Sequence, residues 1–229
     1  MISQHSRACI LTFIGPVGVG KTTQIRLTKD YLKLKNTRVI ETYIKSNHAL
    51  TYILGRFLKA VGAKEEVRYE GFTRIYPRRE IVRKLFPLWC FFDTLSISTK
   101  FLFTVLMPFR LGFTPLIEEG PIMTLHTYIL AFPHFFGTKP TILLTLPSVL
   151  GWIASRDNFT FILDAADDEL NRRRGNRNYR PNELPEYIDM QRKWFRNFSV
   201  GNTIFIDTSG LSALEVHRKI VASLEKGQC

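Results

Sequence analysis

Five short apolar runs recur along the chain, each bounded by polar residues, glycine or proline. They are ACILTFI (8–14), TRVIETYI (37–44), FTPLIEEG (113–120), NFTFILDA (158–165) and NTIFIDTSG (202–210). Runs of this length and composition predict strands buried in a sheet. Between them, apolar residues three or four positions apart predict helices over 21–35, 48–62, 121–132, 167–175, 184–198 and 212–226. The alternation predicts an α/β fold with a parallel sheet covered on both faces.

The stretch between the second and third predicted strands departs from this alternation. After the predicted helix 48–62, residues 64–84 are strongly charged. We interpret them as a flexible or lid-like connection or as an exposed helix start. The aromatic segment from Leu85 to about Met107 predicts one long helix bent near its start, with Pro87 and Pro108 as helix breakers. We therefore expect a single domain, 1–229, that carries an inserted helical region over about 48–112.

Composition and charge limit the class of protein. The chain has 229 residues, of which 45% are hydrophobic, and a formal net charge of +12. This charge suits nucleic acid, an acidic membrane surface or several bound phosphates, although scattered lysines by default form a solvated surface. Three cysteines far apart in the sequence indicate a reducing compartment, so we expect a cytoplasmic protein. The apolar segment 140–157 predicts a helix broken at Pro147, and no run reaches the ~18 apolar residues of a membrane span.

The sequence GPVGVGKTTQ (15–24) follows the first predicted strand and opens the first predicted helix. Its G-x-x-x-x-G-K-T pattern is typical of a phosphate-binding loop, in which backbone N–H groups surround a polyphosphate. Lys21 would reach the β and γ phosphates of ATP, and the Thr22 hydroxyl would bind Mg²⁺. The residues expected to contact the nucleotide here are Gly15, Val17, Gly18, Val19, Gly20, Lys21, Thr22 and Thr23.

Carboxylates at the ends of later strands are candidates for metal binding and proton transfer. The third predicted strand ends in Glu118 and Glu119, and the fourth ends at Asp164. A carboxylate at such a position can hold Mg²⁺ through water or accept a proton from an attacking hydroxyl. We choose Glu119 first and Glu118 second, and Asp164 as a further metal residue. The alternative is that the two glutamates stabilise the start of the next helix through its dipole.

An arginine cluster follows the fourth strand. Arg172, Arg173, Arg174, Arg177 and Arg180 lie around Gly175. Guanidinium groups on a closing loop can neutralise the charge that develops on a transferred phosphoryl group. We therefore interpret about 170–184 as a lid, with the first three arginines as catalytic candidates. A basic helix end or a nucleic-acid patch is the alternative.

An aromatic face with one carboxylate lies in the predicted long helix, at Trp89, Phe91, Phe92 and Asp93. Such a face can stack a nucleobase and fix its orientation. Ordinary core packing is the alternative, because aromatic residues at helical spacing usually face a core.

Taken together, these motifs resemble the thymidylate kinase group of P-loop nucleotide kinases, with deoxynucleoside kinases close by. GKTTQ with its upstream glycines resembles the first family motif, FILDAADDELNRRR the strand and arginine-bearing helix, RNYRPNE the lid, and IFIDTSG the last strand. The resemblance implies a three-layer fold whose five parallel strands have the order 2-3-1-4-5. It also implies ATP and Mg²⁺ as cofactors.

The resemblance also assigns residues and shows departures. Glu119 falls at the family's Asp position and Tyr128 at its later Tyr, whereas Gly120 and Pro121 replace Arg-Tyr. The loss removes an arginine that contacts acceptor phosphate in the family, so Lys45, Arg74 and Arg79 are candidate replacements. The adenine side would be bordered by Ser209 and Gly210, with Arg173 near the nucleotide. The substrate residues expected on this basis are Lys45, Trp89, Phe92, Asp93 and Tyr128.

The leading hypothesis is an ATP-dependent nucleotide kinase that transfers the γ-phosphoryl group to a nucleoside monophosphate. One alternative keeps the chemistry and changes the acceptor to a deoxynucleoside or another small alcohol. A second is a P-loop ATPase or switch acting on nucleic acid or a membrane partner, which the charge permits; nucleic acid is possible as a partner but not favoured. The expected partners are nucleotide substrates and, through the aromatic helix, a second copy of the chain.

Overall fold

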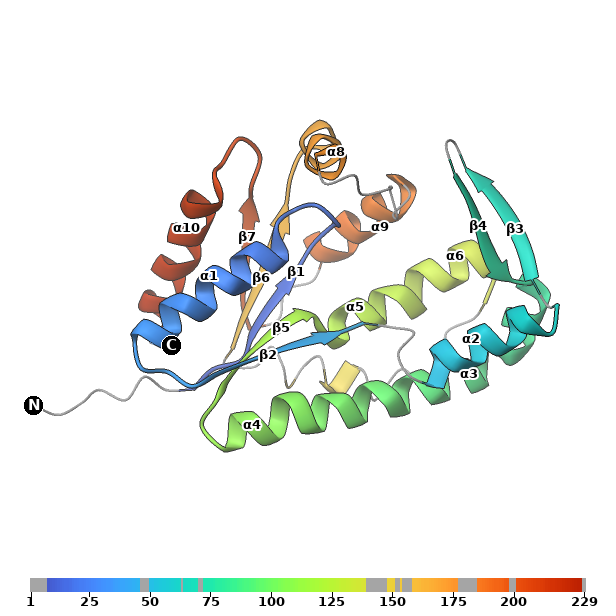
Figure 1. The fold of residues 1–229 in the computed structure, drawn as a ribbon, viewed down its shortest axis with the longest axis horizontal. Coiled ribbons are helices and arrows are strands. Elements are labelled where there is room, and N and C mark those ends of the chain that lie inside the picture. The colour runs from blue at the N-terminus through green and yellow to red at the C-terminus, as the bar shows by residue number, and fades with distance from the viewer. Residues whose placement is uncertain are drawn as a thin grey trace, which may run out of the picture. The chain divides into compact units, whose positions relative to one another are not determined.

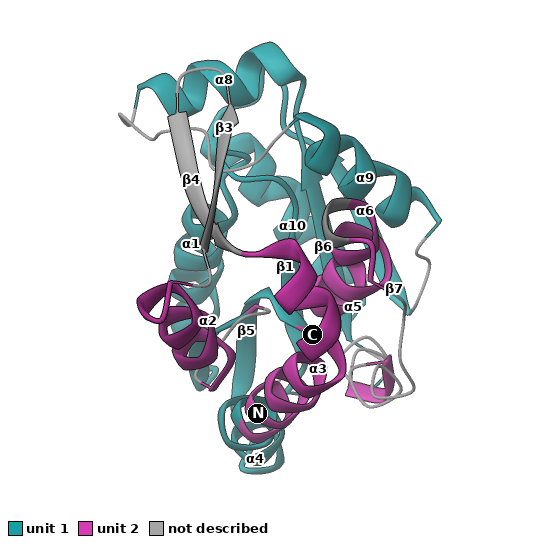
Figure 2. Ribbon diagram, turned by 90° about the vertical axis from the view of Figure 1, so that its right-hand side faces the viewer, with its two compact units in different colours: residues 1–44, 100–120, 151–229 teal, residues 45–99, 121–150 magenta. Residues whose placement is uncertain are grey.

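The computed structural model describes residues 8–45, 50–62, 64–69, 72–138, 148–150, 153, 158–176, 185–197 and 201–227. The chain forms two compact units (Figure 2). Unit 1 comprises 1–44, 100–120 and 151–229, and unit 2 comprises 45–99 and 121–150. The organisation as one domain with an insertion at about 48–112 stays a prediction.

Unit 1 contains a parallel five-stranded sheet (Figure 1). Its strands are β1 (Leu11–Ile14), β2 (Val39–Ile44), β5 (Thr114–Glu119), β6 (Phe159–Asp164) and β7 (Asn202–Asp207). The order β2-β5-β1-β6-β7 places the most buried strand in the middle, where every residue of β1 is covered. All five predicted strands are confirmed, and so is the predicted order 2-3-1-4-5, counted over these five strands.

Helices pack on the sheet through residues that alternate along the strands. Leu11 and Phe13 of β1 face the apolar sides of α1 (Lys21–Leu34) and α10 (Ala213–Lys226), in one core. In Figure 1, α10 and α9 (Pro185–Arg196) lie on opposite sides of β7 and β6. The start of α10 is fixed by a capping box, in which Ser212 and Glu215 exchange side-chain and backbone hydrogen bonds. The three-layer arrangement is therefore as predicted.

Unit 2 is built from helices and one hairpin. Its elements are α2 (Leu50–Ala60), β3 (Lys64–Tyr69), β4 (Phe72–Pro77), α3 (Arg79–Phe101, up to Thr99), α5 (Gly120–His126, from Pro121), a π-helix η2 (Thr127–Ala131) and α6 (Phe132–Phe136). Phe86 and Trp89 of α3 pack against Tyr128 and Phe132, with ring centroids 5.5–6.3 Å apart. A core separate from that of the sheet thus holds these helices together.

The charged segment 64–84 contains the exposed helix start that was one of its two interpretations, because α3 begins at Arg79 with exposed side chains. The part before it is a hairpin, which neither interpretation predicted. Lys64–Tyr69 and Phe72–Pro77 pair as an antiparallel hairpin, from Lys64↔Pro77 to Tyr69↔Phe72, and α3 begins only at Arg79. The sequence KEEVRYEGFTRIYP contains β-favouring Val, Ile, Tyr and Phe residues around a Glu-Gly pair. That is a hairpin signal, although the high charge obscures it.

The expectation that Pro87 and Pro108 break the helix is also wrong. Pro87 lies inside α3, which continues into a π-helix η1 (Leu102–Leu106) and α4 (Met107–Arg110). Pro108 is tolerated because the Met107 N–H donates to Leu102 O, five residues back, in a widened turn. The wider turn relieves the crowding that a proline ring causes in an α-helix.

The same arrangement recurs in unit 2. The π-helix η2 comes directly before α6, whose second residue is Pro133, and the Phe132 N–H donates to Thr127 O. The predicted helix 121–132 is therefore longer than expected and continues through this proline to Phe136.

By length and composition alone, one helical stretch of the described residues, Arg79–Arg110, is long and apolar enough to cross a membrane. Its most apolar window is 33% buried, and a core helix passes the same test, so the evidence is weak. The predicted helix 140–157 is described only at 148–150 and 153, which are helical, and Pro147 lies outside the described residues.

Candidate functional site

The phosphate loop connects β1 to α1 at the carboxyl edge of the sheet. Gly15, Gly18 and Gly20 all have positive φ, at 146°, 94° and 103°. Helix α1 begins at Lys21 directly after Gly20, and its N-cap makes no side-chain hydrogen bond. The first N–H groups of a helix without such a cap, together with its dipole, suit a phosphate. The loop therefore has the backbone conformation of a phosphate-binding loop, and ATP as its ligand stays a prediction.

Lys21 lies over this loop rather than in solvent. Its Nζ donates to Gly15 O at 2.7 Å and to Pro16 O at 3.2 Å. The Glu119 carboxylate lies 3.8 Å from Nζ, and both side chains are 6% exposed. The lysine charge is thus held at the loop in a buried setting, where its interaction with an anion is weakly screened.

The two glutamates that end β5 contact different residues of the phosphate loop and α1. The Thr22 hydroxyl donates to the Glu118 carboxylate, at 3.2 and 3.3 Å from its two oxygens, while Glu119 pairs with Lys21. A positive φ of 72° at Glu119, followed by 76° at Gly120, turns the chain from β5 into α5. The metal assignment preferred Glu119 beside Thr22, but the geometry brings Glu118 there.

The pair of Thr22 and Glu118 suits Mg²⁺, which takes oxygen ligands from one or two carboxylates and completes its shell with phosphates and water. Among the described residues, no group of three or more His, Cys, Asp or Glu side chains could hold a metal ion. Mg²⁺ at Thr22 and Glu118 stays a prediction, in which phosphates and water would supply the remaining ligands.

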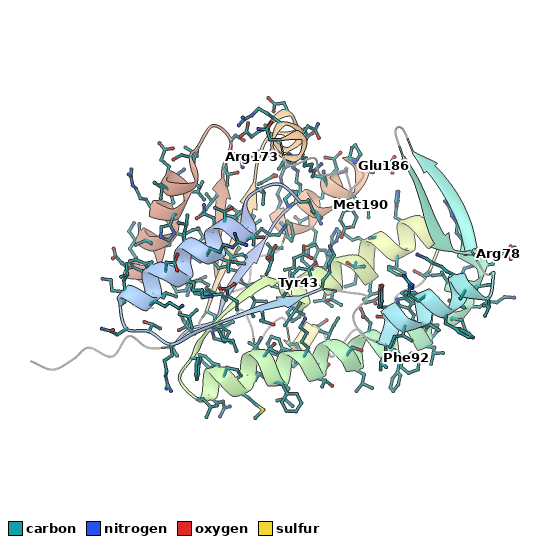
Figure 3. The ribbon with its side chains drawn as sticks, in the orientation of Figure 1. Tyr43, Arg78, Phe92, Arg173, Glu186 and Met190 are labelled. Atoms are coloured by element: carbon teal, nitrogen blue, oxygen red, sulfur yellow. The ribbon has the colours of Figure 1, made fainter. Side chains whose placement is uncertain are left out.

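The three candidate arginines of α8 (Asp167–Gly175) point in different directions. Arg173, labelled in Figure 3, donates from Nη1 to Val19 O at 3.3 Å and from Nη2 to Thr208 O at 2.8 Å. Arg174 is buried and donates from Nε to Val17 O at 2.9 Å. Arg172 is 64% exposed and binds Glu169. The structure therefore brings Arg173 and Arg174, but not Arg172, to the phosphate loop.

The pKa values of Glu169, which is partly buried, and of the exposed Arg172 reflect the bond between them. The Arg172 hydrogen bond lowers the pKa of Glu169 to about 2, with Arg173 adding to the effect. The Glu169 hydrogen bond in turn raises the pKa of Arg172. The Nε–H of Arg173 also donates to the Glu169 carboxylate, at 2.7 Å. This bond fixes the Arg173 side chain, whose Nη1 contacts Val19 O.

Asp164 is engaged by an arginine that the sequence did not single out. Arg192 of α9 donates from Nε to Asp164 Oδ2 at 2.9 Å and from Nη2 to Ala165 O at 2.7 Å, and its Nη1 lies 2.8 Å from Asp167. The carboxylates raise the pKa of Arg192 despite the opposing effect of its burial. Arg192 of α9 thus holds the Asp164 carboxylate at the end of β6, and the role of Asp164 as a metal residue stays a prediction. Arg192 lies 28 residues after Asp164 in a predicted helix, and nothing in the sequence indicated that the two side chains would pair.

The loop after β7 lies beside α8. The Ser209 hydroxyl accepts the Ala166 N–H at 2.8 Å, and the Thr208 N–H donates to Asp164 O at 2.8 Å. Gly210 has a positive φ of 66°. The Ser209 N–H, bonded to the carboxylate of Asp207, lowers the pKa of that group. Ser209 and Gly210 thus belong to the edge that carries the phosphate loop, and Thr208 is a contact that sequence reasoning missed.

The substrate candidates of unit 2 form part of its core. Asp93 is fully buried, and it accepts from the Thr51 hydroxyl at 2.7 Å and from the Tyr128 hydroxyl at 2.5 Å. Trp89 lies in the same core as Tyr128, and the ring of Phe92 contacts that of Phe91. Figure 3 labels Phe92. The two hydroxyl bonds to Asp93 join α2, α3 and η2. The geometry therefore supports the core-packing alternative for Asp93 and Tyr128, and their role as substrate residues stays a prediction.

The remaining parts of the predicted site are Lys45 and the lid. Lys45 follows β2 and is half-buried, as the first residue of unit 2. The lid interpretation covers 170–184, of which 177–184, including Arg177 and Arg180, lie outside the described residues.

The buried Tyr128 predicts an alkaline pH dependence of stability. Burial, and then the charge of Asp93, raise the pKa of Tyr128 well above 10.0. Above pH 10 the unfolded chain loses the phenol proton, whereas the folded chain keeps it. The free energy of unfolding therefore falls as the pH rises past about 10. Tyr128→Phe should remove that part of the slope and cost about 1–3 kcal/mol at neutral pH. Urea unfolding from pH 8 to 11 measures both, and an unchanged slope in the variant contradicts this account.

Comparison with solved structures finds thymidylate kinases. The structure of thymidylate kinase from Candida albicans aligns with a TM-score of 0.53 at 15% identity, over 97% of this chain and 94% of that one. Thymidylate kinase from Ehrlichia chaffeensis aligns with a TM-score of 0.56 at 17% identity, over 96% of this chain and 99% of that one. No protein-family model and no curated protein matches the sequence. At such identities the likeness establishes the fold, which is the P-loop kinase fold of the thymidylate kinases.

Proposed function

We propose that the protein is an ATP-dependent nucleotide kinase that transfers the γ-phosphoryl group to a nucleoside monophosphate. The observation that carries the proposal is the contact of Arg173 and Arg174 with the carbonyls of Val19 and Val17. Two guanidinium groups from another part of the chain thus lie on the phosphate loop. Phosphoryl transfer needs positive charge of this kind around the transferred group, whereas simple nucleotide binding does not.

Each residue of the site has a distinct task in this proposal. The loop N–H groups and Lys21 bind the β and γ phosphates and hold them in one orientation. The Thr22 hydroxyl and the Glu118 carboxylate would hold Mg²⁺, which supplies charge neutralisation when bound. Arg173 and Arg174 stabilise the negative charge that spreads over the transferred phosphoryl group. Such transfer proceeds in line and needs no covalent nucleophile from the protein.

A second acceptor class is favoured by the position of Glu119. Its carboxylate lies at the end of β5 beside Lys21, so it is held near the bound γ phosphate in this proposal. A carboxylate there can accept the proton of an attacking hydroxyl. That chemistry suits a deoxynucleoside or another small alcohol, and Gly120 and Pro121 stand where the thymidylate kinase pattern has residues for acceptor phosphate.

The test is an ADP-release assay with Mg²⁺, ATP and a panel of acceptors. The panel contains the nucleoside monophosphates, the matching nucleosides and a reaction without acceptor. Turnover that requires a monophosphate supports the leading proposal, and turnover with nucleosides alone replaces it with the second. Hydrolysis that no acceptor stimulates rejects both.

Single substitutions of the α8 arginines should separate their roles. Arg173→Ala and Arg174→Ala should each lower kcat by about 10- to 100-fold, with smaller changes in the Kd for ATP, because each removes charge that acts in the transition state. Arg172→Ala should change kcat by less than about twofold, because that side chain is exposed and bound to Glu169. Steady-state kinetics and ATP titration measure the two quantities. Equal losses in all three variants would show that the arginines do not act at the loop.

A further inference from the structure

Arg192 of α9 uses each nitrogen of its guanidinium group on the segment that joins β6 to α8. Nε donates to both oxygens of Asp164, at 3.2 and 2.9 Å, and Nη2 donates to Ala165 O at 2.7 Å. Nη1 lies 2.8 Å from a carboxylate oxygen of Asp167, the first residue of α8. The planar guanidinium group fixes the directions of these bonds, so one side chain holds the end of the strand, the connection and the start of the helix.

The setting of Arg192 strengthens these bonds. Its side chain is 17% exposed, and a further carboxylate, that of Asp189, lies 3.7 Å from Nη1. Hydrogen bonds between charged groups are stronger than neutral ones, and partial burial weakens their screening by salt. Helix α9 also buries Ile188 and Phe195, so its packing does not depend on Arg192 alone.

Asp164 connects Arg192 to the loop that follows β7. The Thr208 N–H donates to Asp164 O at 2.8 Å, and the Thr208 hydroxyl donates to the same oxygen at 3.0 Å. Thr208 is 1% exposed, so water does not compete for these bonds. The end of β6 therefore fixes both the backbone and the hydroxyl of Thr208.

Thr208 in turn holds Arg173 of α8. Nη1 of Arg173 donates to the Thr208 hydroxyl at 3.0 Å, and Nη2 donates to Thr208 O at 2.8 Å. Nη1 also donates to Val19 O, which lies in the phosphate loop. Glu169 holds only the Nε side of the group, from within the same helix. The direction in which the guanidinium group of Arg173 meets the loop is therefore set by Thr208.

We propose that Arg192 is a positioning residue, which holds Arg173 at the phosphate loop through Asp164 and Thr208. Arg192 binds no phosphate itself, because its donor nitrogens are already bonded to the turn between β6 and α8. Its effect on the rate rests on the proposed kinase function, whereas its effect on the orientation of Arg173 does not. A misplacement of about 1 Å in a group that acts on the transition state can lower a rate by on the order of 10²-fold.

Nuclear magnetic resonance of the full chain with isotope-labelled arginine tests the position of Arg173 without any measurement of activity. Arg173→Ala assigns the guanidinium signals. Arg192→Gln should raise the rate at which the Arg173 Nη–H protons exchange with water by about fivefold or more, because their acceptors on Thr208 are no longer held in place. The matched control is Lys193→Gln, which removes the same charge from the next, exposed residue of α9 and should leave this rate within about twofold of the parent.

Two further variants test the path from Arg192 to Arg173. Thr208→Val removes the hydroxyl and should raise the same exchange rate, although Arg192 is unchanged. Arg192→Lys keeps a charge near Asp164, but one ammonium group cannot replace the planar fork, so the rate should lie between those of the parent and Arg192→Gln. Thermal unfolding confirms that each variant folds, and Arg192→Lys decides if Arg192→Gln does not. An exchange rate that stays at the parent value when Arg192 is replaced overturns the proposal.

Kinetics test the consequence for the reaction. Arg192→Gln should lower kcat by about tenfold in the parent, but by less than about threefold in a chain that already carries Arg173→Ala, because residues of one network are not additive. Equal factors in the two backgrounds overturn the proposal, and so does a loss that excess Mg²⁺ restores, because Arg192 would then act through Asp164 on a metal. Absence of turnover with every acceptor rejects the proposed kinase function instead, and the exchange rates of Arg173 still decide the role of Arg192.

Discussion

Lys21→Ala should lower kcat for phosphoryl transfer by at least about 10²- to 10³-fold, to the background of the assay. The reason is the position of the side chain, because Nζ lies 2.7 Å from Gly15 O and is almost fully buried at the start of α1. Water cannot supply the positive charge that the substitution removes. The substitution therefore raises the free energy of the transition state. The assay is ADP release with the best acceptor of the panel.

Lys29→Ala is the matched control for this prediction. Lys29 lies two turns further along α1, where it is 35% exposed and pairs with Glu41. The control removes the same charge from the same helix, and kcat should stay within about twofold of the parent. Equal losses in both variants would show that the phosphate loop is not where the reaction occurs. Thermal unfolding of both variants separates loss of activity from loss of the fold.

Gly15→Ala should destabilise the fold by about 3 kcal/mol or more, since two costs add. A Cβ at this position would lie 2.0 Å from the backbone oxygen of Leu163 in β6, and φ is 146°. Leu163 lies on β6, between two other strands, so its backbone cannot move away from the added Cβ as a flexible side chain could. For a chain of this size the loss corresponds to a fall in Tm of roughly 6–12 °C, which differential scanning calorimetry measures.

Gly175→Ala provides the comparison for this substitution. Gly175 ends α8, where a Cβ would meet nothing within 4 Å and no positive φ restricts the residue. The change should leave the stability within about 1 kcal/mol of the parent, and a small gain is expected from a less flexible unfolded chain. Similar Tm values for the two variants would mean that β6 does not approach the loop as closely as the structure shows.

The sequence predicted the sheet because each strand is a buried apolar run between polar turns. It also predicted the phosphate loop, whose glycines and lysine are diagnostic in order and spacing. The hairpin Lys64–Pro77 was missed because its charged residues hide the β-favouring ones. The long helix was predicted from Leu85, but its start at Arg79 and its continuation past Pro87 were missed, because tertiary packing overrides the local cost of a proline.

The details of the candidate site depended on directions that no pattern shows. Neighbouring arginines on a helix point about 100° apart, so one of the three had to face away, but only the placement of α8 decides which. Likewise, the turn at Glu119 determines which glutamate reaches Thr22. The contact of Arg192 with Asp164 joins two elements, and nothing in either segment alone announces it.

The register of the central strand has a consequence for biosynthesis. Leu11 of β1 pairs with Leu116 on one side and with Phe159 on the other, so both neighbours leave the ribosome long after it. Until then the nascent chain displays an apolar segment without hydrogen-bonded partners, which exposes it to aggregation and makes folding slow. The phosphate loop that follows β1 gains its neighbour β6 only after Phe159–Asp164 have been synthesised. Shielding of β1 during this interval is the task that a chaperone could perform for the chain.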